Sequence, residues 1–211
     1  MGFLFRRKPR PPSLRLFGSE EEKWDGCFVL VREALETDLP VILVAHFKDT
    51  LTFLVKTLEV SDIPWEGHEQ LAQGQPPMGR VTLLPASALS GELPGEEPVR
   101  GDPAARVILA ELHPAAGHDE QVVKAFWGRP HPWDIRRLSS LEDPVIGAFC
   151  GPKMVSLIRG LGLDRNEALH SQMIDRAVVR AQGRLTSRAP DDRPYDNAAA
   201  WLKDNLHDRR S

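Results

Sequence analysis

The sequence predicts an α/β domain in which helices cover both faces of a mainly parallel sheet, with a helical extension toward the C-terminus. Three short segments, Val41–Ala45, Val81–Leu84 and Arg106–Ala110, are almost continuously apolar, as strands buried on both faces of a parallel sheet are. Segments with the apolar spacing of helices lie between them. Because strands that alternate with helices are joined by crossover connections, these observations favour a three-layer architecture.

The first helix is predicted to begin after Ser19, whose hydroxyl can cap it, and to end near Glu36. Three glutamates follow Ser19, where the helix dipole favours acidic side chains. One face of this helix is apolar and consists of Trp24, Cys27, Phe28, Val31 and Leu35. Pro40 then leads into the strand Val41–Ala45, which is followed by a predicted helix over residues 49–59 and a short strand over residues 63–65.

The rest of the chain continues this alternation and then becomes helical. Polar stretches rich in glycine and proline, residues 70–79 and 90–103, are predicted to be loops on either side of the strand Val81–Leu84. The strand at 106–110 is followed by a predicted helix over 119–127 and a last strand over 135–138. From Pro144 onward helices are predicted over residues 145–149, 152–161, 169–185 and 197–206.

We divide the chain into a basic arm, residues 1–18, a folded domain, residues 19–188, and a polar tail, residues 189–211. The arm carries Arg6, Arg7, Lys8 and Arg10 among prolines and is predicted to be flexible. Three interpretations of the arm stay open: a solvated tail, contact with an anionic membrane surface, and contact with nucleic acid.

Composition argues against several classes of protein. The 211 residues carry a formal net charge of −3, whereas nucleic-acid-binding domains are usually basic. The two cysteines, Cys27 and Cys150, do not support a disulfide framework. No apolar run approaches the roughly 18 residues of a membrane-spanning helix, and the first charges follow the apolar residues, the reverse of a signal peptide. A cytoplasmic protein is therefore expected.

The stretch from Ser140 to Arg188 carries the most informative motifs. It reads Ser-Leu-Glu-Asp-Pro-Val-Ile-Gly-Ala-Phe from Ser140, Leu-Gly-Leu from Leu161, and Ile-Asp-Arg-Ala-Val-Val-Arg-Ala-Gln from Ile174. In order and spacing it resembles the end of the second nucleotide-binding domain of the SecA protein-translocation ATPase. Residues 40–66, 79–93 and 106–113 are similar to earlier parts of that domain. The resemblance implies a stand-alone, RecA-like motor domain linked to protein export.

The residues that such a motor needs for hydrolysis are absent from the matching positions. There is no Gly-x4-Gly-Lys-Ser/Thr phosphate loop. The arginine motif of the SecA domain, Gln-x-x-Gly-Arg-x-Gly-Arg, aligns with Gln121 onward and places Ala125 and Gly128 at its arginine positions. Arg129 is one position late and is a candidate for a residual phosphate contact. The resemblance therefore implies no catalytic residue, no cofactor and no ATPase activity.

An aromatic and proline-rich cluster replaces the arginine-rich loop. We expect Phe126 to fill the vacant cleft, and Trp127 and Trp133 to stay partly exposed. Trp127, Pro130 and Trp133 are candidate partner-binding residues, because exposed tryptophans concentrate binding energy. Buried packing of a rebuilt loop is the alternative.

Three histidines, His113, His118 and His131, lie near Glu111 and Asp119 in the sequence. They do not share one helix face, as the histidines of a His-x3-His metal site do. Ordinary hydrogen bonds are expected for them.

The sequence thus predicts a non-catalytic SecA-like module that binds an unidentified protein partner. The alternative is half of an ATPase site, which a separate subunit with the phosphate loop would complete. Convergence of Arg129, Arg136 and Arg137 on an open cleft would favour this alternative.

Overall fold

The computed structural model describes residue 12, residues 14–68, 77–89, 104–127, 133–149, 156, 160, 168–169, 172–186 and 193–207. The strands are β1 (Leu14–Phe17), β2 (Val41–Ala45), β3 (Trp65–Gly67), β4 (Val81–Pro85), β5 (Ala105–Leu109) and β6 (Trp133–Ser140). The helices are α1 (Glu20–Glu36), α2 (Lys48–Val60), α3 (Ala116–Trp127), α4 (Pro144–Phe149), α6 (Gln172–Thr186) and α7 (Ala198–His207), with a short 3-10 helix η1 (Ala86–Leu89).

The strands form one parallel sheet in the order β1-β6-β5-β2-β4-β3. β2 lies between β4 and β5, with Val41 opposite Val81 on one side and Arg106 on the other. All five residues of β2 are buried, which explains why its sequence is apolar without alternation. The prediction that these three segments are buried strands of a parallel sheet is confirmed.

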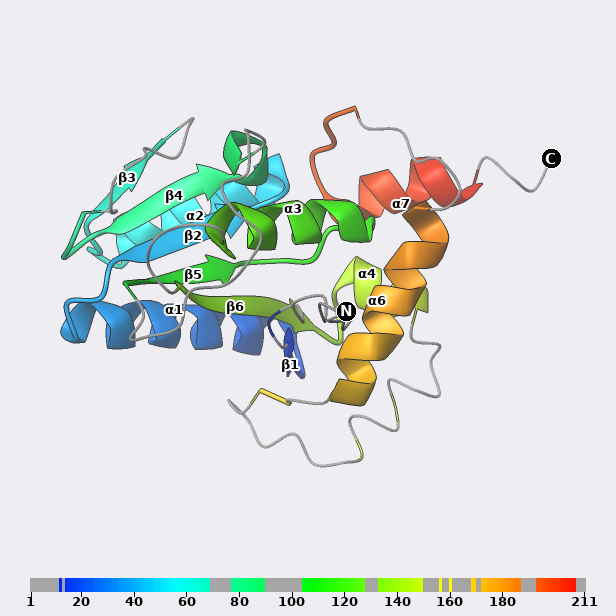
Figure 1. Ribbon diagram of the computed structural model, residues 1–211, viewed down its shortest axis with the longest axis horizontal. Helices are drawn as coiled ribbons and strands as arrows, with labels where there is room; N and C mark the ends of the chain where they lie inside the picture. Colours follow the sequence, from blue (N-terminus) through cyan, green and yellow to red (C-terminus); the bar gives the residue numbers. More distant parts are fainter. Residues whose placement is uncertain are drawn as a thin grey trace, which may run out of the picture.

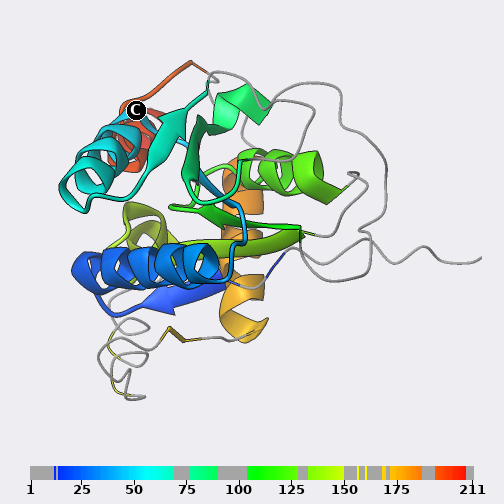
Figure 2. The same ribbon diagram turned by 90° about the vertical axis from the view of Figure 1, so that its left-hand side faces the viewer.

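Helices cover both faces of the sheet, so the predicted three-layer α/β architecture is confirmed (Figures 1 and 2). On one face, α1 and α2 pack through residues such as Phe28 and Leu54 against Leu43 of β2. On the other face, α3 and η1 pack through Phe126 and Leu89 against β2 and its neighbours. Figure 2 shows α1 and α2 to the left of the sheet and α3 to its right.

The C-terminal helices α4, α6 and α7 gather at the carboxyl ends of the strands (Figure 1). The helical C-terminal extension predicted from the sequence is therefore present, and α6 and α7 begin within three residues of the predicted positions. The predicted start of α1 is also confirmed, because the Glu22 N–H donates to Ser19 Oγ at 3.1 Å. No helix in the described ranges is long and apolar enough to span a bilayer.

The predicted boundary of the basic arm at residue 18 is wrong, because Leu14–Phe17 form the edge strand β1. Leu14, Leu16 and Phe17 are buried, and β1 pairs with β6. Leu16 exchanges two backbone hydrogen bonds with Leu169 on its other side. Gly26 in α1 allows this packing, since a Cβ at that position would overlap the Phe17 ring. Alternation of leucine with Arg15 was the signal for a strand.

Two further elements differ from the sequence interpretation. The short strand predicted over residues 63–65 is β3, which begins at Trp65 rather than at Ile63. The polar tail contains the predicted short helix, but α7 is part of the packed domain, since Ala198, Trp201 and Leu202 are buried. These three residues lie at positions i, i+3 and i+4, which is the spacing of one apolar helix face.

Candidate functional site

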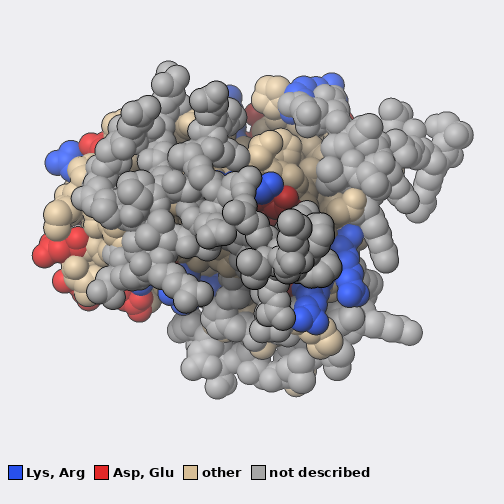
Figure 3. Space-filling view, in the orientation of Figure 1, with Lys and Arg blue, Asp and Glu red and all other residues tan. Residues whose placement is uncertain are grey.

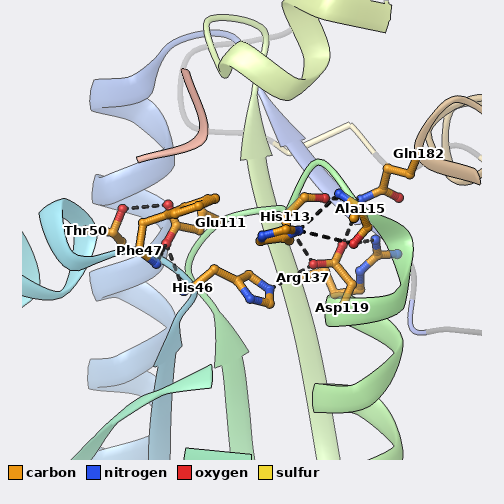
Figure 4. Close-up of polar contacts among 9 residues, drawn as sticks. All are labelled: His46, Phe47, Thr50, Glu111, His113, Ala115, Asp119, Arg137 and Gln182. Carbon is orange, nitrogen blue, oxygen red and sulfur yellow. Dashed lines mark hydrogen bonds and ion pairs between the residues drawn. The ribbon is translucent and has the colours of Figure 1, made fainter. Parts of the chain in front are cut away.

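The connections that follow β2 and β5 leave the sheet toward opposite faces. β2 continues into α2 on one face, and the neighbouring β5 continues into α3 on the other. In open α/β sheets, ligands bind in the crevice at such a point, outside the carboxyl ends of the strands. Figure 4 shows polar side chains meeting there. We call them the switch-point cluster, which consists of His46, Glu111, His113, Asp119, Arg137 and Gln182.

Glu111 occupies the amino end of α2. Its Oε1 accepts hydrogen bonds from the backbone N–H groups of His46 and Phe47, at 2.9 and 3.0 Å, and its Oε2 accepts one from the Thr50 hydroxyl at 2.6 Å. Burial raises the pKa of Glu111, and these bonds oppose that shift. The amino end of a helix is where an anion such as phosphate can bind. In this chain a carboxylate from the β5–α3 connection holds that position.

Asp119, in the first turn of α3, is the centre of the cluster. Its Oδ1 accepts from the His113 N–H at 3.0 Å and lies 2.8 Å from His46 Nε2. Its Oδ2 accepts from Arg137 Nη2 and Gln182 Nε2, both at 3.1 Å. Burial alone would raise the pKa of Asp119, but the contacts with His46 and Arg137 outweigh it and hold the pKa below its usual range. The carboxylate is therefore ionised and joins three elements: α3, β6 and α6.

His113 is neutral and serves as a packing and hydrogen-bonding residue. Burial, with the nearby His46 and His118, lowers its pKa to about 3. Its Nδ1 lies 3.0 Å from the backbone nitrogen of Ala115 and 3.3 Å from the Ala115 carbonyl oxygen. The ring stacks on Phe47, with centroids 5.2 Å apart, and meets Trp201 edge-on at 5.6 Å. The expectation of ordinary hydrogen bonds is confirmed for His113, whereas His131 lies outside the described residues.

The C-terminal helices cover the cluster from outside the sheet. Phe47 and Leu112 at the strand ends pack in one apolar group with Val178 of α6 and with Trp201 and Leu202 of α7. Polar bonds fix α7 in the same place: the Asp49 N–H donates to the Asp196 carbonyl at 3.0 Å, and Asn197 Nδ2 donates to Asp49 Oδ2 at 2.8 Å. The edge of the sheet that usually receives a ligand is thus buried under the chain's own C-terminal segment.

The Ser-Leu-Glu-Asp turn has a structural role. Asp143 caps α4, since its Oδ1 accepts from the Val145 N–H at 2.8 Å, and its Oδ2 accepts from the Ser139 hydroxyl at 2.9 Å. Glu142 Oε2 accepts from the backbone N–H of Glu20 at the start of α1, at 2.9 Å. The motif therefore links the end of β6 to two helices, and burial raises the pKa of Asp143.

The two described arginines of the alternative half-site do not converge. Arg137 is 2% exposed and points into the switch-point cluster. Arg136 forms an ion pair with Asp134, between Nε and Oδ1 at 2.8 Å, and lies on the other face of β6 because successive strand residues alternate. Arg129 lies outside the described residues.

The predicted partner-binding residues are only partly within the described ranges. Trp133 begins β6, is half-buried, and packs against Phe126 with ring centroids 5.0 Å apart. Phe126 is completely buried, but it lies in the cluster between α3 and the sheet rather than in the vacant cleft that it was expected to fill. Trp127 ends α3, but its side chain is not described. Pro130 and the arm residues Arg6, Arg7, Lys8 and Arg10 lie outside the described residues.

Sequence reasoning missed the switch-point cluster as a unit. Glu111 and His113 lie in the stretch 106–113 that resembles the SecA domain, and Gln182 ends the motif that begins at Ile174. Nothing in the local sequence indicates that Gln182 donates to the His113 carbonyl at 2.7 Å, because 69 residues separate the two. The chemical nature of the side chains is the signal that could have identified the cluster. Acidic, basic and amide side chains at strand ends and in helical segments need partners when they are buried.

Comparisons with known proteins agree with the motifs. No family model matches the chain. SecA from Psychrobacter sp. is 30% identical over 108 residues, covering 49% of this chain and 12% of its own length. SecA proteins from Nitratidesulfovibrio vulgaris and Alcanivorax borkumensis are 25% and 26% identical and cover 85% and 91% of this chain. All three are named protein translocase subunit SecA.

These relatives are much longer than the chain. The chain spans 12%, 22% and 26% of their lengths. Among solved structures, the C-terminal part of the Fun30 ATPase domain aligns with a TM-score of 0.44 at 15% identity, covering 77% of this chain and 54% of that chain. The resemblance to SecA predicted from the sequence motifs is confirmed, and it extends over most of the chain.

Proposed function

We propose that this SecA-related chain is a non-catalytic, protein-binding module with a role in protein translocation. One observation carries the proposal: the crevice at the carboxyl ends of β2 and β5 is filled by the switch-point cluster and covered by α7. A nucleotide at this edge would have to displace Glu111 from the amino end of α2. It would also have to separate the ionised Asp119 from Arg137, at a cost of several kcal/mol.

The position that aligns with the first SecA arginine supports the same conclusion. Ala125 is 4% exposed and packs in the apolar cluster between α3 and the sheet. A guanidinium at this position would be buried among apolar side chains, which is costly for a charge. The position has therefore become part of the core, and restoring one arginine would not restore a phosphate contact.

The link to translocation comes from the relatives, whose printed name is that of a translocase subunit. We extend this link to the chain as part of the proposal, with a protein as the partner and the cytoplasm as the compartment. Trp127, Pro130 and Trp133 are the proposed partner-binding face, supported by the half-buried position of Trp133 beside the buried Phe126. The basic residues Arg6, Arg7, Lys8 and Arg10 are a proposed contact to an anionic membrane surface.

Purified full-length protein is expected to release no phosphate from ATP above a protein-free blank, with or without magnesium. The reason is that no described residue is positioned as an arginine finger, the element that accelerates hydrolysis by about 10³–10⁵ in GTPases. A malachite-green assay over several hours measures this. Turnover that survives repurification and is lost in Arg129→Ala would contradict the proposal and favour the half-site alternative.

A further inference from the structure

The outer face of α1 carries two acidic side chains one turn apart. Glu21 and Asp25 are both exposed, and neither forms an ion pair with any residue that the structure describes. One turn further along the same face is Val29, an apolar side chain that is 49% exposed. Positions 21, 25 and 29 follow a spacing of four residues, so they form one stripe along the helix.

The outer face of α6 carries the opposite pattern. Arg176 and Arg180 are exposed, one turn apart, and without an ion pair in the described part of the chain. Met173, one turn before Arg176, is 77% exposed. The inner face of α6 is occupied, with Val178 in the core and Gln182 in the switch-point cluster. Figure 3 shows basic side chains in blue at the lower right, over the region where Figure 1 places α6.

Each stripe is electrostatically unfavourable by itself. Like charges at positions i and i+4 destabilise a helix by about 0.2–0.5 kcal/mol. Both repulsions are relieved when the two stripes face each other. In an antiparallel arrangement, Glu21 lies beside Arg180, Asp25 beside Arg176, and Val29 beside Met173. With a rise of about 1.5 Å per residue, the spacings along the two helices then agree to within about 2 Å.

We propose that the α1 stripe of one copy of this chain packs antiparallel against the α6 stripe of a second copy. Each copy carries both stripes, so the contact is self-complementary in charge. It uses neither the switch-point cluster nor the Trp127–Trp133 face, so it is independent of the proposed function. Exposed ion pairs contribute only about 0.2–1 kcal/mol each. The association is therefore weak and sensitive to salt.

Sedimentation velocity on the full-length chain tests the proposal. In 50 mM salt, the weight-average mass is expected to rise above the monomer value of 23.6 kDa as the concentration increases to about 300 µM, a range suited to weak association. In 500 mM salt it should return to the monomer value, because screening is stronger. Arg176→Glu/Arg180→Glu places acid against acid and should weaken self-association at least about tenfold. Glu21→Arg/Asp25→Arg should do the same.

An equimolar mixture of the two charge-reversed variants should associate again, since the acidic α6 of one variant meets the basic α1 of the other. Lys48→Glu/Lys56→Glu reverses two exposed charges on α2 and should behave as the wild type. Circular dichroism confirms that each variant is folded. Three results would each overturn the proposal. The wild type could stay monomeric in 50 mM salt, either charge-reversed variant alone could associate as the wild type does, or the mixture of the two could stay monomeric.

Discussion

Asp119→Ala is expected to lower the free energy of unfolding by about 3–5 kcal/mol, because it leaves Arg137 buried without a counter-charge. Arg137 and Asp119 are both under 4% exposed, so water does not replace the lost carboxylate. The same change removes the acceptor of the His113 N–H and one acceptor of Gln182 Nε2. Since α3, β6 and α6 all meet at this carboxylate, its loss affects packing around the whole carboxyl edge.

Urea unfolding followed by circular dichroism measures the effect of this change. Glu120→Ala is the matched control, since it removes the next carboxylate, which is exposed and only 3.6 Å from Lys124 in a surface pair. The control should stay within about 0.5 kcal/mol of the wild type. If Asp119→Ala were as stable as Glu120→Ala, Asp119 could not be the centre of a buried network.

The second large effect is loss of stability on acidification, through His113. The pKa of His113 falls from its usual 6.5 to about 3 in the folded chain. Between these values the unfolded chain binds the proton and the folded chain does not. Stability therefore falls as the pH falls, by up to about 1.4 kcal/mol per pH unit below 6.5.

Other buried groups contribute with different signs. The raised pKa values of Glu111 and Asp143 mean that these carboxyls favour the folded state as the pH falls. The lowered pKa of Asp119 costs stability only below its usual value of 3.8. A comparison of the wild type with His113→Gln between pH 7 and pH 5 separates the histidine from these groups.

His113→Gln should be less stable than the wild type at pH 7, and its stability should depend less on pH. Trp201→Phe is the control for packing, since Trp201 meets the His113 ring but does not titrate in this range. It should lower stability by the same amount at every pH. Parallel curves for His113→Gln and the wild type would show that His113 does not titrate differently on folding.

Much of the fold could be predicted from the sequence because its signals are local. An uninterrupted apolar run identifies β2, and Ser19 followed by three glutamates identifies the start of α1. The wrong assignments of β1 and α7 also have physical causes. Leu14–Phe17 is too short, and too close to the basic arm, for its alternation to outweigh the surrounding charge and proline. The segment of α7 is assigned to the polar tail because prolines and charged residues precede it, although Ala198, Trp201, Leu202 and Leu206 form an apolar face.

The candidate site could be predicted only in part. The sequence predicts that the phosphate loop is absent and that the positions aligned with the SecA arginines carry other residues. The sequence does not show which residues fill the carboxyl edge of the sheet, because Glu111 reaches the amino end of α2 from a connection more than 60 residues away. The same applies to Gln182, which enters from α6. Long-range hydrogen bonds of this kind follow from tertiary packing, and a spacing rule cannot detect them.

In this protein the switch point of the sheet is closed by the chain itself. Nitrogen–proton correlation spectra of the full-length protein, recorded during titration with ATP and magnesium to about 5 mM, a range that detects millimolar dissociation constants, test it most directly. The amide signals of His46 and Phe47, which Glu111 accepts from, are predicted to keep their positions throughout. Saturable shifts of these two signals would mean that nucleotide displaces Glu111, and would contradict the account.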